Sequence, residues 1–277
     1  MDKIIVPIDF SEHSEYALQT AAMLAKKNNA EILALHMLEM ANNILTDSDN
    51  EQQAKAVFFL KLAEQKFEDF LSRDYLKGVK IIPIVKHFKV FSEVSEVAED
   101  HSADLIVMGS HGSSGLSEIF VGSNTEKVVR HSNIPVLVVK QKPESVQVET
   151  VVFACDFSDE MVAPYLKARQ FFKDSGSDLK LLYVNLPGER FKSSTEMEAT
   201  VARFLEKADG NVNAINNVHY ISDYTVESGV LNFSNIVGAD LIAVPTHGRK
   251  GIAHFFSGSI GEDIANHSTL PVLTFKI

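Results

Sequence analysis

Short apolar runs alternate with amphipathic stretches along the first half of the chain. The apolar runs are typical of strands buried on both faces of a parallel sheet, and they occupy residues 3–8, 31–38, 79–85, 105–108 and 135–139. Between them apolar residues recur at helical spacing, around residues 17–25, 54–70, 91–99 and 123–131. Residues 42–50 are polar and turn-rich, and we expect a loop there. The alternation predicts an α/β fold in which helices connect parallel strands.

The second half of the chain repeats the first. Residues 152–158 echo residues 5–11, and the tetrapeptide Ala-Asp-Leu-Ile occurs at residues 103–106 and again at 239–242. The segment 141–149 contains Pro143 and mixed polar residues, as linkers do. We therefore expect two tandem doubly wound (Rossmann-like) domains with helices on both faces of each five-stranded parallel sheet, at residues 1–142 and 148–277.

A glycine-rich loop follows the fourth predicted strand. Gly109, Gly112 and Gly122 have the spacing G-x-x-G-x9-G, and Ser123 starts the next predicted helix. Glycines let backbone N–H groups approach an anion, and a helix N-terminus adds further donors, so the loop is interpreted as a phosphate cradle. Ligands of such sheets bind beyond the carboxyl ends of the strands, where the strand order reverses. Asp9, at the end of the first strand, is expected in the same crevice.

Composition and charge restrict the possible partners. The chain has 277 residues, of which 45% are hydrophobic, and a formal net charge of -11, so a nucleic-acid partner is not expected. Its single cysteine, Cys155, excludes an intrachain disulfide. No apolar run approaches the ~18 residues of a membrane span, and the first residues lack the layout of a signal peptide. A cytoplasmic protein with no membrane partner is the expectation.

These motifs resemble those of the universal stress proteins, whose ATP-binding members carry G-x-x-G-x9-G-[ST] after the fourth strand and an Asp after the first. The resemblance covers both halves and implies the strand order 3-2-1-4-5, an internal pseudo-dimer of the two halves, and a possible homodimer. It also implies ATP or a related adenine nucleotide as ligand, with Mg²⁺ shared by the phosphates. Asp9 would contact the ribose or base side, and the implied contacts are Pro7, Asp9, Met37, Met108, Gly109, His111, Gly112, Gly122, Ser123 and Asn124.

The two halves differ at the glycine motif. Residues 113–121 contain Glu118 but no Lys or Arg, so N–H groups and a cation would have to offset a triphosphate. In the second half Pro245 replaces the first glycine, while Arg249 and Lys250 add positive charge. The second site is expected to be degenerate or differently specific, with Asp156, Val184, Gly248, Gly258 and Ser259 as its residues.

Structural alternatives stay open for several of these residues. Ser123 and Ser259 each start a capping-box pattern, and Asp156 precedes a helix start where acidic residues are favoured anyway. His111 and His247 are expected to form hydrogen bonds rather than to act as general bases. No His or Cys spacing predicts a metal site.

A regulatory, stress-response role is preferred to catalysis. The chain has no P-loop, no dinucleotide turn and no nucleophile elbow, so it is not expected to be an enzyme. Two alternatives remain: a weak ATPase, and a nucleotide-free scaffold. In the scaffold the fifth strands, Pro135–Val139 and Pro271–Thr274, pair at their edges.

Overall fold

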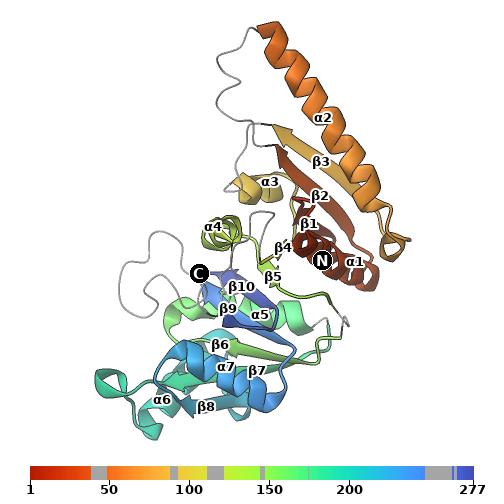
Figure 1. Ribbon diagram of the computed structural model, residues 1–277. Coiled ribbons are helices and arrows are strands. Elements are labelled where there is room, and N and C mark those ends of the chain that lie inside the picture. Colours follow the sequence, from red (N-terminus) through yellow and green to blue (C-terminus); the bar gives the residue numbers. More distant parts are fainter. Residues whose placement is uncertain are drawn as a thin grey trace. The chain divides into compact units, whose positions relative to one another are not determined.

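The computed structural model describes residues 1–38, 49–87, 93–110, 122–143, 147–173, 175–246, 264 and 267–277. These residues belong to two compact units (Figure 1). Unit 1 comprises Met1–Glu118, Gly122–Val128 and Val139–Val146, and unit 2 comprises Ile119–Val121, Val129–Val138 and Gln147–Ile277. The division places β5 (Val136–Val139), except for its last residue, in unit 2.

Unit 1 contains a parallel sheet in the order β3-β2-β1-β4. Its strands are β1 (Lys3–Pro7), β2 (Glu31–Leu38), β3 (Ile81–His87) and β4 (Leu105–Gly109). The helices that connect them are α1 (Glu12–Asn28), α2 (Asp49–Leu71) and α3 (Val94–Asp100), with the short 3-10 helix η2 (Asp74–Leu76) before β3. Helix α4 (Ser123–His131) follows β4, and Figure 1 shows α1 and α2 on one face of the sheet and α3 on the other.

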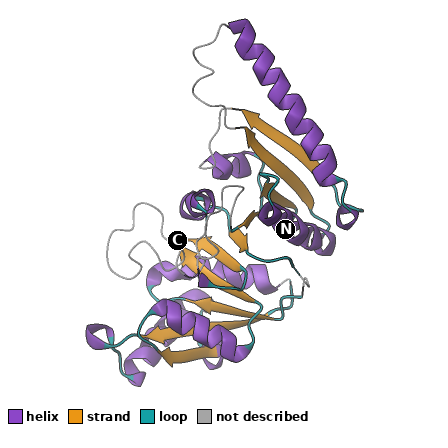
Figure 2. Ribbon diagram, viewed as in Figure 1, coloured by secondary structure: helices purple, strands orange, loops and turns teal. Residues whose placement is uncertain are grey.

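Unit 2 repeats this order as β8-β7-β6-β9-β10, so the expected order 3-2-1-4-5 is confirmed. Its strands are β6 (Thr150–Ala154), β7 (Asp178–Asn185), β8 (Val218–Ser222), β9 (Leu241–Thr246) and β10 (Val272–Lys276). Its helices are α5 (Val162–Lys173), α6 (Ser194–Asp209) and α7 (Val226–Val237), and Figure 2 shows α5 and α7 on opposite faces of the sheet. Three 3-10 helices complete it: η4 (Asp159–Met161), η5 (Gly188–Arg190) and η6 (Asn213–Asn217).

Within unit 2, β5 runs antiparallel to β10. Leu137 faces Leu273 and Val138 faces Val272, and the Thr274 hydroxyl donates to the Val136 carbonyl over 3.3 Å. The pairing of the two fifth strands expected from the sequence is therefore confirmed. It also makes the sheet mixed at this point, because strands β6 to β10 of the described residues pair with one another in parallel.

The central strands are buried on both faces, as their continuous apolar runs predict. Ile4, Ile5 and Val6 in β1 and Leu105 to Val107 in β4 have no exposed surface. In unit 2 the same holds for Val151 to Phe153 in β6. Burial of this kind contributes roughly 1.5–3 kcal/mol for each large apolar side chain, so these central strands contribute strongly to the stability of each unit.

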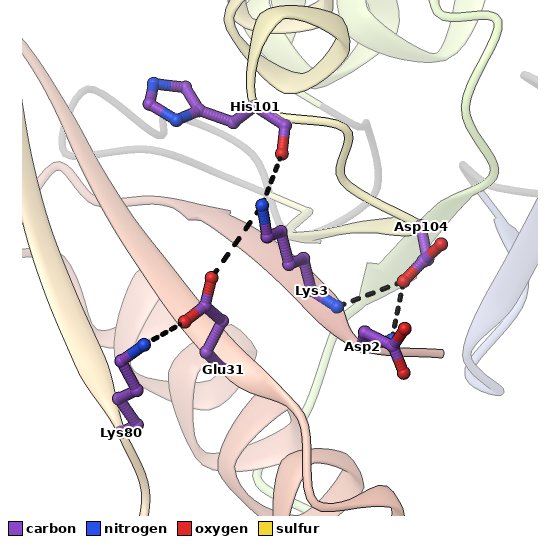
Figure 3. A network of polar contacts seen from close by, with 6 residues as sticks. All are labelled: Asp2, Lys3, Glu31, Lys80, His101 and Asp104. Carbon is purple, nitrogen blue, oxygen red and sulfur yellow. Dashed lines mark hydrogen bonds and ion pairs between the residues drawn. The ribbon is translucent and has the colours of Figure 1, made fainter.

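The tetrapeptide Ala-Asp-Leu-Ile, which is identical in the two halves, has a structural role. The Oδ2 atom of Asp104 accepts the backbone N–H groups of Asp2 (2.6 Å) and Lys3 (3.0 Å), and Figure 3 shows this contact beside the ion pairs that link Lys3, Glu31 and Lys80. In unit 2, Asp240 accepts from Glu149 and Thr150, both over 2.9 Å. Both aspartates therefore tie the amino ends of neighbouring strands together, at the edge opposite to the carboxyl ends.

Candidate functional site

The candidate site of unit 1 begins at the tight turn that follows β1. The Asp9 carboxylate accepts the backbone N–H of Ser11 over 3.0 Å and its hydroxyl over 2.5 Å. Ser11 in turn caps α1, because its hydroxyl oxygen accepts the N–H of Ser14. Between them Phe10 has a left-handed backbone, with φ of 63°, which costs about 1–2 kcal/mol for a bulky residue. The bonds of Asp9 stabilise this turn and hold its carboxylate at the end of β1.

The same turn is present in unit 2. Asp156 accepts the N–H of Ser158 over 2.9 Å, and Phe157 between them has φ of 56°. Phe157 is buried and stacks on Tyr183, with ring centroids 5.7 Å apart. Both aspartates consequently have a structural role in an Asp-Phe-Ser turn, which is the alternative that the sequence left open for Asp156.

Gly109 lies where α1 approaches the end of β4. A Cβ atom at this position would lie 2.6 Å from both the carbonyl carbon and the carbonyl oxygen of His13. Strand β1 pairs with β4 through Ile4 and Leu105, and with β2 on its other side. The order of the strands thus reverses at β1, and the first turn of α1 lies against the carboxyl end of β4. The predicted reversal of strand order between β1 and β4 is confirmed, and a shared site of Asp9 and the glycine motif stays a prediction.

Hydrogen bonds close the base of the glycine-rich loop. The Gly122 N–H donates to the Ser110 carbonyl over 2.6 Å, and the Thr125 hydroxyl donates to the Gly109 carbonyl over 2.9 Å. The start of α4 is thereby held beside the end of β4. His111 and Gly112 lie outside the described residues.

Helix α4 begins one residue earlier than a capping box at Ser123 requires. The Gly122 carbonyl accepts the N–H of Glu126 over 3.0 Å, and Ser123 is the first helical residue. Gly122 therefore occupies the cap position, and the expectation that Ser123 is the cap is wrong. The hydrogen bond from the Gly122 N–H to the Ser110 carbonyl lies directly before this helix start. The first turn of α4, which includes Asn124, carries N–H groups that no earlier turn of the helix can bond.

The remaining expected residues of unit 1 take part in the core. Met37 and Met108 are each 4% exposed, and Pro7 is buried where β1 pairs with Leu35 of β2. Their side chains pack inside the unit, so any ligand contact would come from their backbone. In unit 2, Val184 is half-buried, whereas Gly248, Gly258 and Ser259 lie outside the described residues.

His36 and Phe10 form an aromatic group at this end of the sheet that sequence reasoning did not find. The Nδ1 atom of His36 lies 2.7 Å from the Ile8 carbonyl, to which a neutral imidazole donates, and the two rings are 4.7 Å apart. Phe67 and Phe70 of α2 pack on Phe10 edge to face. Burial lowers the pKa of His36, and the nearby Lys66 ammonium lowers it further. No spacing along the chain signals this group, because helix α2 brings two of its members from about sixty residues away.

Pro245 is accommodated in unit 2 without a gap in the sheet. It lies within β9 and faces Phe275 of β10. The 3-10 helix η4 precedes α5, whereas α1 begins directly after its cap Ser11. The segment that follows the Asp-Phe-Ser turn therefore differs between the two units.

Two classes of site are not found among the described residues. Within the ranges given above, no group of three or more His, Cys, Asp or Glu side chains could hold a metal ion. The helices of the same ranges include none that is long and apolar enough to span a membrane.

Comparison with known proteins gives one consistent result. The profile of the universal stress protein family matches residues 1–140 and 147–276. A universal stress protein of Methanocaldococcus jannaschii is 32% identical over 157 residues, covering 50% of this chain and 95% of that protein. Universal stress protein G of Escherichia coli O157:H7 is 32% identical over 140 residues, covering 50% of this chain and 97% of that protein.

Solved structures resemble the whole chain. A universal stress protein from Archaeoglobus fulgidus has a TM-score of 0.66 at 24% identity and covers 99% of this chain and 96% of its own. A protein from Pseudomonas aeruginosa, described as a universal stress protein, has a TM-score of 0.65 at 13% identity, with 100% and 93% covered. These structures share the fold along its full length, with both halves included.

Proposed function

The chain belongs to the universal stress protein family, and from this premise we propose that its first half binds ATP or a related adenine nucleotide and uses the bound nucleotide as a regulatory signal. The observation that carries the proposal is the meeting of three features at the carboxyl ends of β1 and β4. These are the fixed Asp9 carboxylate, the close approach of α1 at Gly109, and the closed base of the loop at Gly122.

Each feature suits one part of a nucleotide. The Asp9 carboxylate can accept hydrogen bonds from ribose hydroxyl groups, which are donors that an anionic oxygen binds well. The first turn of α4 and the glycine loop offer backbone N–H groups, which favour phosphate oxygens. Residues 113–121 contain Glu118 and no basic residue, so a divalent cation, Mg²⁺, is proposed to bind with the phosphates and to offset their charge.

The proposed role is binding rather than turnover. The sequence contains no P-loop, no dinucleotide turn and no nucleophile elbow, and this supports binding rather than turnover. The His36 imidazole beside the turn donates from Nδ1 to the Ile8 carbonyl and packs among aromatic rings. We propose that occupancy of the site changes the conformation or the partner choice of the protein, and that domains 1–142 and 148–277 act as one intact and one altered module.

Isothermal titration with ATP, ADP, AMP and GTP, each with Mg²⁺, tests the proposal. Saturable binding of an adenine nucleotide at one site per chain is expected, with GTP weaker. Replacement of Gly122 by Val is expected to abolish it, because a β-branched side chain would separate Gly122 from Ser110. Asp9→Asn should weaken the affinity for ATP by about tenfold, since one charge-assisted hydrogen bond contributes roughly 1.5–3 kcal/mol.

Asp156→Asn is the matched control for Asp9→Asn. Asp156 forms the same turn in unit 2, so this variant has the same local consequence for folding but leaves the proposed site unchanged. Its ATP affinity should equal that of the wild type. If no nucleotide binds at millimolar concentration with Mg²⁺, the proposed function is wrong.

A further inference from the structure

Unit 2 contains a pocket at the carboxyl ends of β6 and β7. Much of its wall is apolar, and it includes Ala154, Leu182, Val184 and Val226. Its charged residues come from two places: Asp156 from the turn after β6, and Arg190 and Lys192 from the segment between β7 and α6. The pocket therefore combines one carboxylate and two cations with a hydrocarbon surface.

Lys192 is held in place by a buried asparagine. Asn185, 4% exposed at the end of β7, donates from its side-chain amide to the Lys192 carbonyl over 3.0 Å and accepts the Lys192 N–H over 3.1 Å. Both halves of the Asn185 amide are thus bonded to the backbone of one residue. The Lys192 ammonium lies 5.9 Å from the centre of the Tyr183 ring, at the pocket. The two bonds fix the backbone from which the Lys192 side chain extends at the pocket.

Asp156 is also oriented by the fold. Its Oδ1 atom accepts the Ser158 N–H over 2.9 Å, and the left-handed Phe157 between them is locked by its stacking on Tyr183. Glu196, which lies near Lys192, is bonded to the N–H and the hydroxyl of Ser193 in a capping box. The nearby carboxylate of α6 is consequently engaged in capping its own helix.

The corresponding segment of the first half has the opposite charge. Between β2 and α2, residues 39–48 include Glu39 and Asp47 and no Lys or Arg. Between β7 and α6, the shorter segment carries Arg190 and Lys192, with Glu189 beside them. Equivalent strand ends in the two halves thus bear different charge, and ligand recognition at these ends should differ accordingly.

We propose that the pocket of unit 2 binds a small hydroxylated organic anion, such as a sugar phosphate or a sugar acid. Its phosphate or carboxylate group binds Arg190 and Lys192, because guanidinium and ammonium groups donate strongly to such oxygens. A hydroxyl group donates to the Asp156 carboxylate, and the carbon skeleton rests against Val184 and Val226. The proposal concerns the second half alone and does not depend on nucleotide binding by the first.

Titration of the full chain with a set of probes tests this site. Ribose 5-phosphate combines a phosphate monoester with hydroxyl groups, gluconate combines a carboxylate with hydroxyl groups, and ribose and inorganic phosphate each carry one of the two features. Saturable binding of ribose 5-phosphate or gluconate is expected, at least tenfold tighter than ribose or phosphate. The anion that binds with the higher affinity shows whether the site prefers a phosphate or a carboxylate.

Variants then locate the bound probe. Arg190→Gln and Lys192→Gln should each weaken the affinity for the probe about tenfold, as expected for loss of a charge-assisted hydrogen bond. Lys167→Gln, the same charge change at an exposed position of α5, should leave the affinity within about twofold of wild type. Asp156→Asn should weaken binding, whereas Asp9→Asn in the first half should not.

Three results would overturn the proposal. The first is the absence of saturable binding by either anion, and the second is equal affinity for ribose 5-phosphate and inorganic phosphate. The third is loss of binding in Asp9→Asn but not in Asp156→Asn, which would place the probe in the first half. Circular dichroism of each variant confirms that it is folded, and an unfolded Lys192 variant is replaced by Lys192→Met, which keeps the aliphatic part of the side chain over Tyr183.

Discussion

At the scale of single residues, the two Asp-Phe-Ser turns show that one side chain can have a structural and a binding role together. Asp9 and Asp156 both accept the N–H of the serine two positions later. The bond stabilises a turn in which the phenylalanine backbone is left-handed. The ring of Phe10 then packs on helix α2, and the ring of Phe157 packs on strand β7. The carboxylate is held at the end of its strand for a structural reason, and any ligand there meets an already oriented group.

His36 makes a pH-dependent contribution to stability. Burial lowers its pKa below the ordinary value of 6.5, so between the two pKa values the unfolded chain binds more protons than the folded chain. The free energy of unfolding should therefore be fully maintained above pH ~6.5 and fall as the pH drops below it. Urea unfolding measures the free energy of unfolding at about pH 7.5 and at about pH 5. The decrease between the two pH values should be smaller in His36→Gln than in the wild type.

The other groups packed on His36 are Phe10, Phe67 and the Ile8 carbonyl, and the charged groups near it are Lys66 and Asp9. His101→Gln serves as the control, because His101 lies beside Lys3 at the amino-terminal edge of the sheet (Figure 3). An equal loss of stability in His36→Gln and wild type would contradict the role given to His36.

At the scale of elements, close packing of helices on strands explains two glycines. Gly109 allows α1 to touch the end of β4, and Gly229 allows α7 to touch β7. The obstacle to a Cβ atom differs between them. At Gly109 it is the backbone of His13 at 2.6 Å, and at Gly229 it is mainly the Val184 side chain, also at 2.6 Å. Backbone atoms within a helix cannot move alone, whereas a valine can adjust.

Gly109→Ala should therefore destabilise the protein more than Gly229→Ala. Overpacking costs typically about 1–3 kcal/mol, and the upper end is expected at Gly109 because α1 must shift as a whole. At Gly229 the cost is partly offset by roughly 1 kcal/mol of helix propensity gained by alanine over glycine. The midpoints of urea unfolding measure the difference, and equal midpoints for the two variants would show that the contact between α1 and β4 is loose.

At the scale of the whole molecule, the boundary of the compact units does not follow the boundary of the sequence repeat. Residues 129–138 belong to the first repeat, yet they cluster with unit 2, where β5 pairs with β10. Each fifth strand thereby gains a neighbour for N–H and C=O groups that would otherwise be left at an edge. The Lys276 ammonium adds a hydrogen bond to the Arg130 carbonyl over 2.6 Å, at the end of α4.

Leu137→Pro should consequently disturb the second repeat from a position in the first. Proline removes a ladder hydrogen bond, and within sheets it is found almost only on edge strands or at bulges. Hydrogen exchange is expected to accelerate at Val272 to Thr274, the partners of β5. Tyr220→Pro in the edge strand β8 provides the comparison and should leave exchange in β10 unchanged. Unaltered exchange in β10 of Leu137→Pro would contradict the pairing.

The sequence by itself determined the strands, the helices, the repeat and the family. These depend on apolar periodicity and on short motifs, which are local or recur at a fixed interval, as in the two Asp-Phe-Ser turns. The predicted start of α4 at Ser123 is confirmed, whereas its cap, Gly122 instead of Ser123, was missed because the contact of Gly122 with Ser110 crosses a loop and leaves no local pattern.

Only the tertiary structure decided which side chains meet. Phe10 and His36 meet because β1 and β2 are adjacent, and Asn185 and Lys192 meet because the intervening segment folds back on the end of β7. The pairing of β5 with β10 joins residues 138 and 272, and its antiparallel direction follows from three-dimensional packing. Contacts between distant parts of the chain depend on chain direction and on close packing, and neither is encoded in the spacing of apolar residues along one segment.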